Sequence, residues 1–69
     1  METTPENIRA FRHARWRVKF TSQLIVLHEG IQDQDTELWR EEHAEYLNRH
    51  ASAKESLTVF PTEWDSLYP

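Results

Sequence analysis

The stretch that decides the fold is TPENIRAFRHARWRVKFTSQLIVLHEG, Thr4–Gly30. Thr4 can cap the first turn of a helix, and Pro5 suits the first helical position, where a missing N–H costs nothing. Gly30 is the only glycine in the chain, and it stands where helices commonly end in a left-handed residue. No proline or glycine lies between Pro5 and Gly30. We therefore predict one long helix over about residues 5–28.

The apolar side chains of this helix fall into two stripes at about 100° per residue. The first stripe is Ile8, Phe11, Val18 and Ile25. The second stripe is Trp16, Phe20, Leu24, Leu27 and Ile31. Because the chain has only one other long helix, one stripe needs a further partner, most simply a second copy. We expect the first stripe to form the seam of a homodimer and the second to pack against the other helix and the tail, although the swapped assignment fits the same pattern.

A β-hairpin is the competing interpretation of residues 16–29. Trp16–Thr21 alternates apolar and basic residues, and Leu24–Glu29 is rich in strand formers. However, the Ser22-Gln23 pair between them is poor chemistry for a two-residue turn, which favours glycine or asparagine at positive φ. A lone hairpin is also weak in water. The continuous helix is therefore the favoured prediction.

A second helix is predicted over about residues 36–53, after a polar connection, with Asp35 or Thr36 as its cap. Its apolar face repeats at heptad-like spacing through Trp39, His43, Tyr46, His50 and Leu57. Glu45 and Arg49 are spaced for an i, i+4 ion pair on the outer face.

The last segment, residues 56–69, is not predicted to form a long helix. Pro61 biases the residue before it away from helix, so we expect an extended tail in which Thr62 caps a short turn. Trp64, Leu67 and Tyr68 supply a large apolar surface that requires packing. The tail should therefore fold back over the helix pair. The predicted fold is all-α: a single domain over residues 1–69, with residues 1–3 disordered, built as an antiparallel two-helix hairpin.

Composition narrows the class of protein further. At 69 residues, burial is marginal and association with another chain is a common remedy. The chain has no cysteine, which excludes disulfides and thiolate metal sites. The longest apolar run, Leu24–Leu27, is far too short to span a bilayer, and the acidic N-terminus is no secretory signal. We expect a soluble, cytoplasmic protein.

Charge is divided between the two halves of the chain. Residues 1–31 carry five basic and three acidic residues, whereas residues 32–69 carry three basic and nine acidic residues. This asymmetry favours packing of the halves on one another, within a chain or between chains. It also predicts one basic and one acidic patch that can each attract a partner.

The titratable residues form no recognisable catalytic or metal-binding motif. His43 and His50 are seven residues apart, too far along a helix to share one metal ion. The cluster Glu41, Glu42 and Glu45 is typical of a solvated helix face. The sequence shows no nucleophile–base pair and no glycine-rich loop, so we expect no enzyme, no metal and no cofactor.

The basic run Arg9–Lys19 is interleaved with Phe11 and Trp16, a combination that can grip phosphates and stack on bases. Its cations point in many directions around a helix, and the pI of about 5.5 is wrong for a dedicated nucleic-acid binder. A small nucleic-acid-binding dimer is therefore an alternative function, as is a structural subunit of a larger assembly.

Protein binding is the favoured function, because three Trp, three Phe and two Tyr are a heavy aromatic load for this length. Trp, Tyr and Arg dominate the energetics of protein interfaces. The candidate partner-binding residues are Arg9, Arg12, Arg15, Arg17, Trp39 and Tyr46.

The general build resembles small early proteins that phages make to inhibit host regulators, and most nearly the quorum-sensing anti-activator of Mu-like phages. The resemblance is carried by the whole chain: the Thr4-Pro5 start, the basic aromatic helix Arg9–Lys19, Gly30, and the second helix from Trp39 to His50. It contains no family-specific motif, so no functional residue is transferred. The resemblance implies stoichiometric binding to a host protein, such as a transcription regulator, which is blocked without chemistry.

Overall fold

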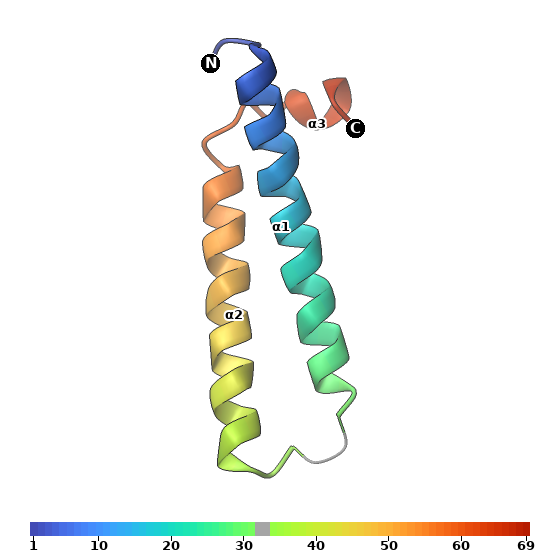
Figure 1. Ribbon diagram of the computed structural model, residues 1–69, viewed down its shortest axis with the longest axis vertical. Helices are drawn as coiled ribbons and strands as arrows, with labels where there is room; N and C mark the ends of the chain where they lie inside the picture. Colours follow the sequence, from blue (N-terminus) through green and yellow to red (C-terminus); the bar gives the residue numbers. More distant parts are fainter. Residues whose placement is uncertain (32–33) are drawn as a thin grey trace.

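The computed structural model covers residues 1–69 and describes all of them except 32–33. Its described residues form three helices, α1 (Pro5–Glu29), α2 (Glu37–Leu57) and α3 (Trp64–Leu67). α1 and α2 lie antiparallel, side by side, and the short α3 stands beside the N-terminal half of α1 (Figure 1). The predicted helical hairpin is therefore confirmed, and the β-hairpin over residues 16–29 is wrong. The molecule is a rod of 47 × 17 × 17 Å.

The helix ends follow local chemistry, with one exception. Thr4 Oγ1 accepts a hydrogen bond from the Asn7 N–H at 3.2 Å, and Thr36 Oγ1 accepts one from the Trp39 N–H at 3.1 Å, so both predicted caps form. Gly30 is the exception, because its φ of −78° is right-handed and not left-handed as predicted. Its N–H continues the helical pattern by donating to the carbonyls of Val26 and Leu27.

The interface between the two long helices is a narrow heptad seam. On α1, the buried residues are Phe11, Ala14, Thr21 and His28, with Val18 and Ile25 half-buried between them. On α2, the seam consists of Trp39, His43, Tyr46, His50 and Ala53. At its centre Thr21 Oγ1 lies 2.8 Å from His50 Nδ1. The seam is thus held by polar contacts and stacked rings as much as by aliphatic burial.

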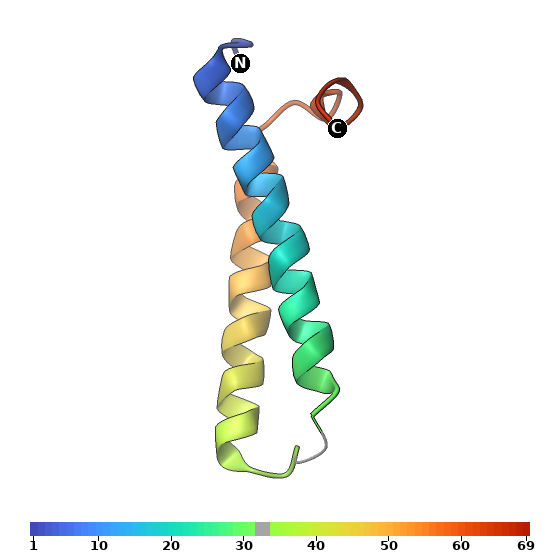
Figure 2. The ribbon, with the colours of Figure 1, turned by 45° about the vertical axis from the view of Figure 1, so that its right-hand side comes forward.

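The tail packs against the end of the rod that holds the N-terminus of α1. Trp64 is 3% exposed and packs edge-on against Phe11, with ring centroids 5.7 Å apart, while Phe60 lies 5.5 Å from Phe11. The prediction that the tail folds back is confirmed, and Figure 2 shows the segment crossing from the end of α2 to α3. Its predicted extended conformation is wrong, because α2 continues to Leu57 and residues 58–60 form turns. Thr62 also does not cap α3, since no side chain caps that helix.

The structure reverses the expected roles of the two apolar stripes of α1: the first stripe, and not the second, packs against α2 and the tail. Phe11 is 2% exposed, and Ile8, Val18 and Ile25 are half-buried, so the stripe expected at a dimer seam lies on the covered face. The reason is that Thr21 and His28 lie on the same face of α1 as this stripe and bond to α2. The Thr21 hydroxyl contacts His50 Nδ1, and the His28 carbonyl oxygen accepts from Trp39 Nε1. The second stripe is left facing solvent.

Candidate functional site

An exposed apolar strip runs along the outside of α1 and continues to Ile31. We call it the outer stripe, and its residues are Trp16, Phe20, Val26, Leu27 and Ile31. Trp16 is 55% exposed, Phe20 43% and Leu27 72%. With about 3.6 residues per turn, these three side chains lie within about 40° of one another, opposite the seam with α2.

The outer stripe has two parts: a pair of stacked aromatic rings towards its N-terminal end and a shallow hollow further along the helix. The rings of Trp16 and Phe20 stack with centroids 4.9 Å apart and planes 10° from parallel. Further along the helix, a shallow hollow of about 370 Å³ is lined by Ser22, Gln23, Val26 and Leu27. The stripe therefore offers a flat aromatic platform followed by an aliphatic recess, which suits contact with another apolar surface.

Basic residues lie beside the N-terminal half of this stripe and beyond its N-terminal end. We call Arg9, Arg12 and Lys19 the basic flank, and all three are exposed. Arg12, Arg15 and Lys19 line a hollow of about 520 Å³ together with Trp16 and Pro69. Since cations beside an exposed aromatic attract carboxylates or phosphates, this half of the stripe favours an acidic partner.

The structure separates the six residues that the sequence suggested for partner contact. Arg9 and Arg12 are exposed, and Arg15 and Arg17 are half-buried, with the Arg15 guanidinium 5.0 Å from the Phe11 ring centre. Trp39 and Tyr46 instead pack between the helices, where the Tyr46 ring lies edge-on to His28 at 5.1 Å. Both side chains are half-buried there, so they offer less surface to a partner than Arg9 and Arg12 do.

A second recess adjoins the C-terminal half of the outer stripe, and we call it the edge hollow. Its volume is about 180 Å³, and its lining is Leu24, Leu27, His28, Ile31, Glu42 and Tyr46. Glu42 Oε2 is 3.7 Å from His28 Nε2. An apolar recess with a half-exposed carboxylate at its edge is suited to a long basic side chain, whose methylene groups and charged head need different surroundings.

His28 is the residue that sequence reasoning missed at this end of the rod. It is 4% exposed, and neither of its ring nitrogens has a hydrogen-bond partner among the residues that the structure describes. Its ring stacks against Trp39 at 4.5 Å and lies 5.7 Å from His43. The signal was present in the sequence, because position 28 continues the heptad that starts at Phe11. Within the described part of the chain, no group of three or more His, Cys, Asp or Glu is placed to hold a metal ion.

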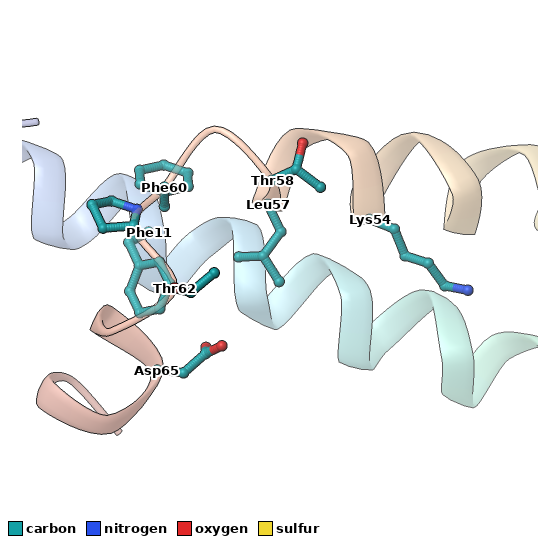
Figure 3. Close-up of a pocket in the computed structure, with 8 residues that line it drawn as sticks. Phe11, Lys54, Leu57, Thr58, Phe60, Thr62 and Asp65 are labelled. Atoms are coloured by element: carbon teal, nitrogen blue, oxygen red, sulfur yellow. The ribbon is translucent and has the colours of Figure 1, made fainter.

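A hollow of about 290 Å³ lies under the tail (Figure 3). Phe11 and Phe60 lie together at one end, Lys54 lies at the other, and Leu57 lies between them. Phe11 and Phe60, which line this hollow, also belong to the aromatic cluster that holds the tail in place. We therefore attribute the hollow to the packing of the tail.

Two further findings bear on the class of protein. Among the described helices, none combines the length and hydropathy needed to cross a membrane. No protein-family model matches the chain, and no curated protein or solved structure is significantly similar to it.

Proposed function

We propose that this chain is a non-enzymatic protein-binding module that inhibits or adapts a larger protein, such as a transcription regulator, in the cytoplasm. The outer stripe is the observation that carries the proposal. A monomer in solution rarely keeps a contiguous apolar face uncovered unless that face has a partner. Stoichiometric blocking of a regulator is also what the resemblance to small phage inhibitors implies.

The partner is characterised by the chemistry of the surface. Trp16 is an exposed indole stacked on Phe20, and Arg12 lies beside it in the same hollow. Trp and Arg are over-represented among the residues that dominate binding energy. The complementary surface is an apolar groove bordered by Asp or Glu on the side that meets the basic flank.

A matched pair of substitutions tests this proposal. Phe20 on the outer stripe is 43% exposed and Leu47 on α2 is 46% exposed, so Phe20→Glu and Leu47→Glu place a new charge at positions of equal burial. Binding to a panel of purified transcription regulators is measured by calorimetry, and circular dichroism verifies that each variant is folded. We expect Phe20→Glu to weaken binding at least tenfold and Leu47→Glu to leave it unchanged. Equal binding by the two folded variants, or no binding by the wild type across the panel, contradicts the proposal.

Nucleic-acid binding is a second candidate, favoured by the hollow in which Arg12, Arg15 and Lys19 surround Trp16. Such a site would bind phosphates electrostatically and stack a base on the indole, with strong dependence on salt. Gel retardation of single- and double-stranded DNA and RNA at low salt tests it. Retardation that Arg12→Glu abolishes supports this candidate, and its absence in the wild type removes it.

A further inference from the structure

We propose that in the free protein the outer stripe is covered by a second copy of the chain, with the two α1 helices antiparallel about a two-fold axis. This inference rests on the proposed function, because it assigns a first occupant to the same docking surface. The dimer is then the resting form, and a target protein competes with the second copy for the stripe.

The accessible surface of the single chain argues for such a partner. A folded monomer of 8.3 kDa is expected to expose about 4,600 Å², whereas this chain exposes 5254 Å². The excess is roughly 700 Å² and follows from the rod shape of 47 × 17 × 17 Å, in which one side of α1 stays uncovered. A standard specific interface buries ~800 Å² of each partner. The outer stripe is the longest apolar face available to cover that area.

The distribution of charge along α1 selects the antiparallel orientation. Arg12 and Lys19 lie beside the N-terminal half of the stripe and Arg9 lies beyond it, whereas no Lys or Arg of α1 lies beyond Lys19. An antiparallel pair therefore keeps the basic residues of the two copies apart. A parallel pair would place like charges together, which is unfavourable at interfaces.

The edge hollow supplies a contact specific to this arrangement. With the two-fold axis at the midpoint of Phe20 and Leu27, helical spacing brings Arg17 of one copy level with Gly30 of the other, about 3 Å along the helix from His28 and on the same side of the helix pair. Arg17 is half-buried and has no carboxylate within 4.0 Å among the described residues. Its guanidinium can therefore reach Glu42 at the border of the second copy's edge hollow.

Orientation is tested by cross-linking, for which the chain offers a background free of cysteine. Gln23 lies at the centre of the stripe and Arg9 beyond its N-terminal end, and both are exposed. In the antiparallel dimer the two Arg9 positions are about 40 Å apart, at 1.5 Å per residue. We expect Gln23→Cys to form a disulfide-linked dimer under mild oxidation and Arg9→Cys to form none. Cross-linking of both variants overturns the antiparallel orientation.

The dimer and its edge contact are tested by light scattering coupled to chromatography and by analytical ultracentrifugation. We expect a wild-type dimer, loss of the dimer in Phe20→Glu, and retention in the matched control Leu47→Glu. Arg17→Glu and Glu42→Arg should each raise the dissociation constant about tenfold, and the double variant should restore it to within threefold of wild type. A wild-type monomer at tens of micromolar overturns the dimer, and a double variant no better than the single variants overturns the Arg17–Glu42 contact.

The outcomes distinguish the two proposals. A monomeric wild type that still binds a regulator through Phe20 removes the second copy and leaves the proposed function. A stable antiparallel dimer that binds no regulator at any concentration supports self-association and contradicts the proposed function.

Discussion

The imidazole of His28 lies parallel to the indole of Trp39, with ring centroids 4.5 Å apart and planes 15° from parallel. The Trp39 Nε1–H also donates to the His28 carbonyl oxygen at 3.1 Å. Together these contacts join the last turn of α1 to the first turn of α2. They hold together the connected end of the rod and thereby fix the register of the two helices.

Replacement of Trp39 by Phe should destabilise the hairpin. Phe keeps an aromatic ring for stacking but removes the N–H that donates to His28, and a net hydrogen bond plus lost ring area is worth about 1–2 kcal/mol. Urea unfolding followed by circular dichroism measures the change. The matched control is Trp16→Phe on the exposed stripe, which should alter the free energy of unfolding by less than about 0.5 kcal/mol when both are measured at the same low concentration. Equal effects of the two changes would contradict this account.

Replacement of Thr21 by Val should uncouple the helices near their midpoint. The Thr21 hydroxyl lies 2.8 Å from the Arg17 carbonyl and 2.8 Å from His50 Nδ1. When its single hydrogen goes to the carbonyl, the His50 Nδ1–H donates to Oγ1. Val preserves the shape but leaves the imidazole without its partner, at a cost of about 1–2 kcal/mol.

The control for Thr21 is Thr58→Val, because Thr58 is exposed and its hydroxyl bonds only to the Glu55 carbonyl of its own chain segment. It should change stability by less than about 0.5 kcal/mol. In a His50→Ala background, Thr21→Val should lose most of its effect. An undiminished effect there would show that Thr21 acts independently of His50.

Replacement of Phe11 by Leu should loosen the tail. Leu retains much of the buried area but loses the edge contacts to Phe60 and Trp64, each worth about 0.5–1.5 kcal/mol. We expect faster proteolysis after residue 57 and a weaker near-ultraviolet signal from Trp64. Phe20→Leu, on the outer stripe, should leave the tail protected. A tail that stays equally protected in both variants would refute the anchoring role of Phe11.

Replacement of Gly30 by Ala should stabilise the protein by about 0.4–1 kcal/mol, because Ala has less conformational freedom to lose on folding. The right-handed φ of −78° accepts a side chain, and the new Cβ would lie 3.3 Å from the Leu27 carbonyl oxygen, a tight contact. Thermal or urea unfolding measures the shift. Destabilisation by more than 1 kcal/mol would indicate that this residue needs a left-handed conformation in solution.

Much of the fold could be predicted from local pattern. Thr4 and Thr36 mark the starts of the two long helices because a hydroxyl before a helical run caps the free N–H groups of its first turn. The heptad spacing from Trp39 to His50 marked the inner face of α2. The prediction of a left-handed conformation at Gly30 was wrong, because a glycine after a helix permits that conformation but does not require it.

The candidate site was harder to predict, because both stripes of α1 are apolar enough to be covered. The choice between them depends on Thr21 meeting His50 and on Phe11 meeting Trp64, pairs that are 29 and 53 positions apart along the chain. No periodicity within α1 contains that information. For the same reason, the sequence does not indicate that Trp39 and Tyr46 pack in the seam with α1.

By itself, the sequence determined that this chain forms two long helices and that one of them is apolar on two opposite sides, because helix periodicity and capping are local properties. Only the tertiary structure decided which side is covered. On the covered face of α1, Thr21 meets His50 across the seam and Phe11 meets Trp64 of the tail. Trp16, Phe20 and Leu27 stay exposed, so the outer stripe remains the surface available to another molecule.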